Sequence, residues 1–120
     1  PMAEGLLTGK IGAAQTFAKG DNRAKNKLFQ ADSYARVQAA LTKLRPIADR
    51  KGVTLGQLAL SWVTSQPGAC AIAGARNAKQ ASENAKAGSI ALSDEELSQI
   101  DQIGRSVTDY LDEDPVMWNL

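Results

Sequence analysis

The chain has 120 residues, of which 43% are hydrophobic, so it is long enough to bury one core and a wholly disordered protein is excluded. Fourteen basic residues face thirteen acidic ones, and the formal charge of +1 lacks the broad positive field that nucleic-acid binding requires. The sequence has no histidine, which excludes histidine-dependent triads and makes zinc sites and histidine-assisted hydride chemistry poor expectations within this chain.

The first 32 residues predict loops. The opening PMAEGLLTGK (residues 1–10) combines proline, two glycines and a short apolar pair, which favours an ordered loop over a helix. Residues 11–32 show no sustained periodicity and contain the polar breaker KGDNR, so a long surface loop is expected there.

Two amphipathic helices are expected next. Apolar side chains three or four residues apart predict a helix from about Ser33 to Lys51, which Pro46 is expected to kink. Thr54 and Gln57 form a capping-box pattern at the start of the following helix, which ends at Pro-Gly. Its apolar stripe, expected to lie in the core, consists of Leu55, Leu58, Ala59, Trp62 and Val63.

The run from Ala69 to Ala73 is apolar and bounded by Pro-Gly and Gly74, which predicts a buried strand of the parallel type. The single cysteine, Cys70, is interpreted as a small buried thiol, and the lack of an internal disulfide fits a reducing cytoplasm. No apolar run approaches the roughly 20 residues of a membrane-spanning helix, so a soluble protein without a membrane partner is expected.

Two further capped helices complete the pattern. Asn77, with Gln80 three residues on, predicts the start of a short helix that Gly88 closes. Ser93 and Glu96 form a second capping-box pattern. The inner face of the helix that they begin is expected to carry Leu97, Ile100 and Ile103.

A single buried strand leaves its backbone N–H and C=O groups without ladder partners. The 120 residues are therefore expected to form part of a larger parallel α/β structure, in which either a further segment or another copy supplies the missing strands.

Residues 73–84, AGARNAKQASEN, have the outline of an anion-binding site. Gly74 permits close approach, the start of the helix offers free N–H groups, and Arg76 supplies a forked donor for a phosphate. From the residues alone, an arginine near a helix start is more often a solvated surface group. By the same reasoning, Gln80, Glu83 and Asn84 are exposed helix residues.

Residues 71–88, AIAGARNAKQASENAKAG, closely resemble the cofactor segment that follows the last barrel strand of aldo/keto reductases. PMAEGLLTGK resembles the segment after their seventh strand, and TLGQLALSWVTSQPG and LSDEELSQID resemble the helices that flank the eighth strand. The resemblance covers nearly the whole chain in the family's order. It implies the α/β class: a carboxy-terminal fragment, about half or less, of a (β/α)8 barrel, mostly helical with one or two short parallel strands.

The resemblance also implies an NADP(H) site within one partial domain, with a pyrophosphate loop at 1–10, a surface loop at 11–32, and helices, last strand and adenosine-phosphate segment at 33–120. Arg76 would pair with the 2′-phosphate and favour NADP over NAD, and Lys10 would lie near the pyrophosphate. For Leu6 and Leu7, packing in the core is at least as good an interpretation as contact with the cofactor. The implied cofactor-binding residues are Met2, Gly5, Leu6, Leu7, Lys10, Gly74, Arg76, Gln80, Glu83 and Asn84.

The sequence departs from the family in two ways. Ala73 stands where the family often has proline. The catalytic tetrad of aspartate, tyrosine, lysine and histidine comes from the first half of the barrel, with which nothing here aligns, and Tyr34 and Tyr110 lie in segments that do not match it. The chain is therefore expected to bind cofactor and to lack reductase activity alone.

Two alternatives stay open. The first is a structural or interaction module that forms a homo-oligomer or complements a separate amino-terminal half barrel, because a half barrel leaves an open edge and an apolar face. The second is that the chain is an expressed fragment of a full enzyme.

Overall fold

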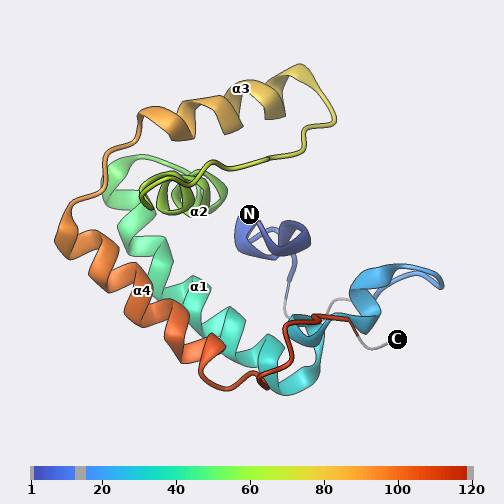
Figure 1. Ribbon diagram of the computed structural model, residues 1–120. Coiled ribbons are helices and arrows are strands. Elements are labelled where there is room, and N and C mark those ends of the chain that lie inside the picture. The colour runs from blue at the N-terminus through green and yellow to red at the C-terminus, as the bar shows by residue number, and fades with distance from the viewer. Residues whose placement is uncertain (1, 13–15, 119–120) are drawn as a thin grey trace.

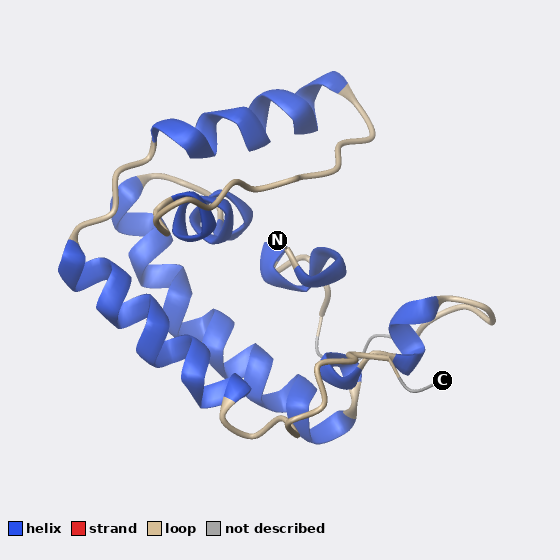
Figure 2. Cartoon of the chain, in the orientation of Figure 1, coloured by secondary structure: helices blue, strands red, loops and turns tan. Residues whose placement is uncertain are grey.

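The computed structural model describes residues 2–12 and 16–118. In these two ranges the chain is helical and contains no strand (Figure 2). The α-helices form an arc with η1 on its concave side in the view of Figure 1. The α-helices are α1 (Ala31–Lys51), α2 (Leu55–Thr64), α3 (Ala78–Lys86) and α4 (Asp94–Thr108). The 3-10 helices are η1 (Ala3–Thr8), η2 (Asn22–Lys25), η3 (Lys27–Phe29) and η4 (Ala87–Ser89).

Helix α1 confirms the long amphipathic helix expected from the apolar spacing, and it begins two residues earlier than predicted. Pro46 lies inside it, and the helix continues for five further residues. Gly52 ends it with φ of 66°, a left-handed conformation that glycine adopts without steric cost. The Gly52 N–H donates to carbonyl oxygens of the last turn, Ala48 and Asp49.

Both predicted capping boxes are confirmed. At the start of α2, the Gln57 N–H donates to Thr54 Oγ1 and the Thr54 N–H donates to Gln57 Oε1, each over 3.1 Å. At the start of α4, Ser93 and Glu96 exchange the same pair of bonds at 3.2 and 2.9 Å. These bonds satisfy amides that the first helical turn leaves without partners.

Asn77 caps α3 as predicted, because its side-chain oxygen accepts from the Gln80 N–H at 2.9 Å. The expected closure at Gly88 is wrong. α3 ends at Lys86 and the chain tightens into η4, which contains Gly88. Ala87 is 2% exposed, so the turn is fixed by burial of a methyl group, and no glycine in a left-handed conformation is needed.

The core lies where α1, α2 and α4 meet η1. Its fully or nearly buried members are Leu6, Val37, Ala40, Leu41, Ile47, Ala48, Leu55, Leu58, Ile100 and Val107. Trp62 is partly buried against this cluster, and its indole N–H donates to the Asp101 carboxylate at 2.6 Å. The predicted stripe of α2 is thus confirmed at Leu55 and Leu58, with Trp62 at the margin of the core. Ala59 and Val63 are half-buried outside the cluster, and Leu60, which was not predicted, is 2% exposed.

Helices α1 and α4 pack antiparallel. At one end the Lys51 ammonium lies 2.9 Å from the Glu96 carboxylate and donates to the Ala91 carbonyl. At the other end the Arg36 guanidinium lies 3.5 Å from the centre of the Tyr110 ring. Each end of the pair is thus held by a cation, and the apolar contacts lie between the two ends.

The predicted buried strand is wrong for the described chain. Residues Ala69 to Ala73 form no ladder, Ile72 is 85% exposed, and Cys70 is exposed where a buried thiol was expected. A strand satisfies its backbone groups only through neighbouring strands, and no segment among residues 2–12 and 16–118 supplies one. The apolar side chains consequently face solvent.

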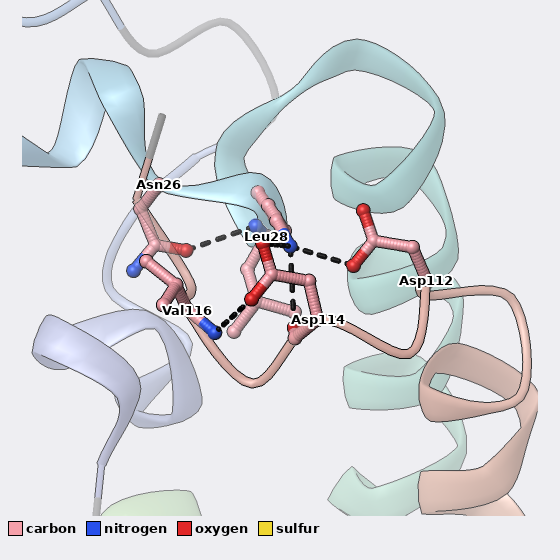
Figure 3. A network of polar contacts seen from close by, with 6 residues as sticks. Asn26, Leu28, Asp112, Asp114 and Val116 are labelled. Atoms are coloured by element: carbon pink, nitrogen blue, oxygen red, sulfur yellow. Dashed lines mark hydrogen bonds and ion pairs between the residues drawn. The ribbon is translucent and has the colours of Figure 1, made fainter. Parts of the chain in front are cut away.

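The expected surface loop at 11–32 is more ordered than its sequence indicates, although its residues 13–15 lie outside the described ranges. Asn26 is 4% exposed, and its side chain accepts from the Leu28 N–H at 2.9 Å (Figure 3). The Lys27 ammonium lies 2.6 Å from the Asp112 carboxylate and donates to the Asp114 carbonyl at 3.2 Å. The acidic tail therefore closes over the loop through contacts distant in sequence.

Replacing Leu58 with alanine should lower the free energy of unfolding by about 2–5 kcal/mol, because the side chain is buried among large neighbours. The matched substitution Ile72→Ala should change that free energy by no more than about 0.5 kcal/mol, since Ile72 faces solvent. Urea denaturation followed by circular dichroism measures both. Equal effects of the two substitutions would contradict the assigned core.

Acid should weaken the contact between α1 and α4. The hydrogen bond from the Ser93 N–H, followed by the Lys51 ammonium, lowers the pKa of Glu96. The contribution of the Glu96 charge is therefore present above the unfolded-state pKa of about 4.3 and is lost as pH falls through the lowered folded-state pKa. Glu96→Gln keeps a capping oxygen and removes the charge.

Wild type should accordingly be more stable than Glu96→Gln at pH 6, and the difference should shrink toward zero near pH 3. Urea unfolding of both proteins at the two pH values tests this expectation. If the stability difference between the two proteins is the same at both pH values, the Glu96 charge contributes nothing to stability.

Candidate functional site

The first candidate segment is the amino-terminal turn. Its backbone reverses at Glu4 and Gly5, whose φ angles are 55° and 91°. The Met2 carbonyl accepts from the Gly5 N–H at 3.1 Å, and the Thr8 hydroxyl donates to the Gly5 carbonyl at 2.6 Å. Thr8 Oγ1 then accepts from the Lys10 N–H at 3.3 Å. The expectation of an ordered loop is thus wrong in part: the segment forms the short 3-10 helix η1, a turn held by hydrogen bonds of its own backbone and of the Thr8 hydroxyl.

This turn is packed against α2. Leu6 is fully buried in the core and Leu7 packs partly buried beside it, so core packing accounts for both side chains. Gly9 has φ of 68°, and a Cβ atom there would lie 2.7 Å from Leu55 Cδ1, which leaves room only for glycine. Met2 reaches the same helix, since its sulfur lies 3.4 Å from where a Cβ of Gly56 would stand. These contacts fix the position of the turn against α2.

Lys10 is exposed where this turn ends. Its ammonium has no ion pair in the part of the chain that the structure describes. Of the five positions that the sequence singled out here, Lys10 is thus the one with a charged group open to a ligand. Met2, Gly5, Leu6 and Leu7 offer backbone and packing.

The second candidate segment is the loop at 74–76 with the first turns of α3. The Arg76 N–H donates to Gln80 Oε1 at 2.8 Å, and the Asn84 side-chain amide donates to the Gly74 carbonyl at 3.1 Å. Together they fold the loop back onto α3. The family resemblance counts Gln80 and Asn84 among the cofactor-binding residues; in the structure, their side chains hold the loop at 74–76 against α3.

The Arg76 side chain is exposed and has no ion pair or side-chain hydrogen bond within the described ranges. Arg76 directly precedes Asn77, which caps α3 by accepting from the Gln80 N–H; the N–H groups of Ala78 and Lys79 have no intrahelical acceptor. A free guanidinium close in sequence to free helix amides, with the helix dipole behind them, is an arrangement that favours anions such as phosphate. Gly74 is exposed with open space around it, as a close approach requires.

Helix α3 is tied to α2 by two side chains that sequence reasoning did not assign to the site. Gln57 Nε2 donates to the Glu83 carbonyl at 2.9 Å, in addition to the capping bond of its Oε1. Ser61 is fully buried, and its hydroxyl lies 3.1 Å from the Ala87 carbonyl and 2.7 Å from the Gln57 carbonyl. In the sequence, Gln57 stood out only through its capping-box position. Nothing in the sequence pointed to Ser61.

Helix α2 therefore contacts both candidate segments, η1 and α3. Each segment places one unpaired cation, Lys10 or Arg76, at an exposed position. Two exposed cations of this kind suit anionic groups such as phosphates, and neither segment carries a histidine or tyrosine. Within the described ranges, no group of three or more potential metal ligands is present.

The chain was compared with known proteins. The model of the aldo/keto reductase family matches residues 1–105. An uncharacterized oxidoreductase of Mycobacterium tuberculosis is 40% identical over 93 residues, which are 78% of this chain and 28% of that protein. An NADP(+) aldo-keto reductase of Schizosaccharomyces pombe is 32% identical over 101 residues, which are 83% of this chain and 30% of that protein.

The fold is also similar to a solved structure. It superposes on the glycerol dehydrogenase of Gluconobacter oxydans with a TM-score of 0.83 and 30% sequence identity, covering 98% of this chain and 36% of that one. The chain thus spans about a third or less of the length of the relatives it matches. No helix among the described residues is long and apolar enough to cross a membrane.

Proposed function

Because this chain belongs to the aldo/keto reductase family, we propose that it is the carboxy-terminal part of a (β/α)8 barrel and holds the phosphate and adenosine parts of NADP(H). The observation that carries the proposal is the unpaired Arg76 side chain beside the free amides of α3. Gln80 and Asn84 support the proposal because their hydrogen bonds hold the loop that carries Arg76 against α3.

Arg76 favours NADP over NAD in this proposal. A guanidinium pairs with the 2′-phosphate through two parallel hydrogen bonds, and NAD lacks that phosphate. The names of the relatives include both an NADP(+) enzyme and an NADH-specific one, so the proposed preference rests on Arg76. Gly74 would allow the adenosine ribose to approach the backbone, and Gln80, Glu83 and Asn84 would lie toward the adenine.

The amino-terminal turn takes the pyrophosphate in this proposal. Lys10 supplies the charge, and the turn from Met2 to Gly9 supplies a surface that is fixed on α2. Leu6 and Leu7 contribute by holding the turn in the core and need not touch the cofactor. The fixed turn lowers the conformational entropy lost on binding.

Reduction of a carbonyl needs hydride from the nicotinamide ring, which the cofactor supplies, and a positioned acid for the oxygen. Neither tyrosine of the chain fits that role. The Tyr34 hydroxyl donates to the Gly12 carbonyl, and the Tyr110 ring is covered by Arg36. We therefore propose that the chain alone binds cofactor without turning over substrate.

A second candidate function is assembly. The unpaired apolar segment at 69–73, with Ile72 85% exposed, favours pairing with strands of an amino-terminal half barrel or with a second copy. The two functions are compatible, since pairing would bring this cofactor site to a catalytic half. We also propose a cytoplasmic location, because the exposed Cys70 has no disulfide partner within these 120 residues.

NADP+ should bind more tightly than NAD+, and Arg76→Ala should weaken NADP+ binding by about tenfold or more while leaving NAD+ binding nearly unchanged. Lys86→Ala is the matched control, since Lys86 is an exposed cation at the other end of α3. Titration calorimetry with both cofactors measures the effect. An equal, negligible response of wild type to NADP+ and NAD+ would refute the proposal.

The isolated chain should leave NADPH oxidation at the rate without protein, when aldehydes and ketones are supplied as substrates. The expected loss reflects the missing general acid, which contributes about 10²–10⁴-fold in such reactions. Turnover that Tyr34→Phe or Tyr110→Phe abolishes would overturn this expectation. Activity that appears only on adding an amino-terminal half protein would support assembly.

A further inference from the structure

A groove between α1 and α4 lies outside the two cofactor segments. Its charged lining consists of Arg36, Lys43, Arg50 and Arg105, with Asp109 as the one carboxylate. The whole chain has a formal charge of only +1, so positive charge is concentrated in this groove and the rest of the chain is net negative. Such segregation creates a local field that attracts anions.

The cations of α1 are regularly spaced. Arg36, Lys43 and Arg50 follow one another at intervals of seven residues, which places them on one face of the helix. Seven residues rise about 10 Å, so the three charges form a stripe about 21 Å long. A small anion could contact one of them at a time, whereas an extended anionic partner meets all three.

These cations form no ion pairs within the described chain. None of the four basic side chains forms an ion pair in the described ranges, although the Lys27 and Lys51 ammonium groups both do. The Arg36 guanidinium lies over the Tyr110 ring, which holds it at one end of the groove without neutralising its charge. The stripe therefore keeps its charge available to a partner.

The groove also has an apolar floor. Among the lining residues, Pro46 is exposed, Ile103 is half-buried and Ile47 is buried; the uncharged polar residues Gln99, Gln102 and Ser106 also line the groove. An apolar floor with a basic rim complements a helix whose apolar stripe is flanked by carboxylates. Nucleic acid, with phosphates along its whole surface, would leave this floor uncovered.

We propose that the groove between α1 and α4 docks an acidic amphipathic helix whose carboxylates recur every seven residues. Its apolar stripe would lie on Pro46 and Ile103, and its carboxylates would meet the stripe of Arg36, Lys43 and Arg50. This proposal does not depend on cofactor binding, because no residue of the groove belongs to either cofactor segment.

The test uses a fluorescein-labelled helical peptide of about 18 residues, roughly 27 Å long, with glutamate at every seventh position and leucine along one stripe. A control peptide has the same composition with its glutamates clustered at one end. Fluorescence anisotropy should show that the 120-residue chain binds the regular peptide more tightly than the control, and that added salt weakens the binding. Equal binding of the two peptides would overturn the proposal.

Lys43→Glu should weaken binding of the regular peptide about fivefold or more, because attraction is replaced by repulsion. Lys19→Glu is the matched control at an exposed position outside the groove and should leave affinity within about twofold. Lys43→Gln tests the same contact without a new repulsion, with helix content checked by circular dichroism. Wild-type affinity in both Lys43 variants, or tighter binding of a single-stranded oligonucleotide than of the peptide, would overturn the proposal.

Discussion

Helix α2 holds α3 through the hydrogen bond from the Gln57 side-chain amide to the Glu83 carbonyl, and the buried Ser61 hydroxyl of α2 lies 3.1 Å from the carbonyl of Ala87, the first residue of η4. Leaving a buried polar group unpaired costs about 1–3 kcal/mol, so α3 cannot separate from α2 without a penalty. The same helix fixes the amino-terminal turn, where contact between Gly9 and Leu55 admits no larger residue. The positions of both proposed cofactor segments thus depend on one short helix whose own start is set by a capping box.

Local chemistry made the helix starts predictable. Thr54 with Gln57 and Ser93 with Glu96 satisfy their amides within four residues, so the sequence pattern contains the whole interaction. The strand at 69–73 could not be judged in this way, because an apolar run indicates burial only if other strands pair with it. The contact between the acidic tail and Lys27 could not be predicted from the sequence either, since Asp112 lies 85 residues from Lys27.

The candidate site was predictable in its charged parts. Arg76, two residues after Gly74, and Lys10, directly after Gly9, stood out as cations close to glycines, and both are exposed and without an ion pair in the described chain. The parts that position them were not predictable: Gln80 and Asn84 read as ordinary surface residues, yet their amides fix the loop at 74–76. Ser61 is a polar residue in an apolar helix. Only the structure shows that its hydroxyl lies within hydrogen-bonding distance of the Gln57 and Ala87 carbonyl oxygens.

Chemical-shift mapping of the ¹⁵N-labelled chain with adenosine 2′,5′-bisphosphate tests the central claim most directly, because this probe carries the distinguishing phosphate and no nicotinamide. The account predicts saturable shifts at the amides of residues 74–84, the loop and first turns of α3, with no comparable shifts along α4. It predicts weaker shifts with adenosine 5′-monophosphate. Shifts that fall on the groove between α1 and α4, or that are equal for the two nucleotides, would contradict it.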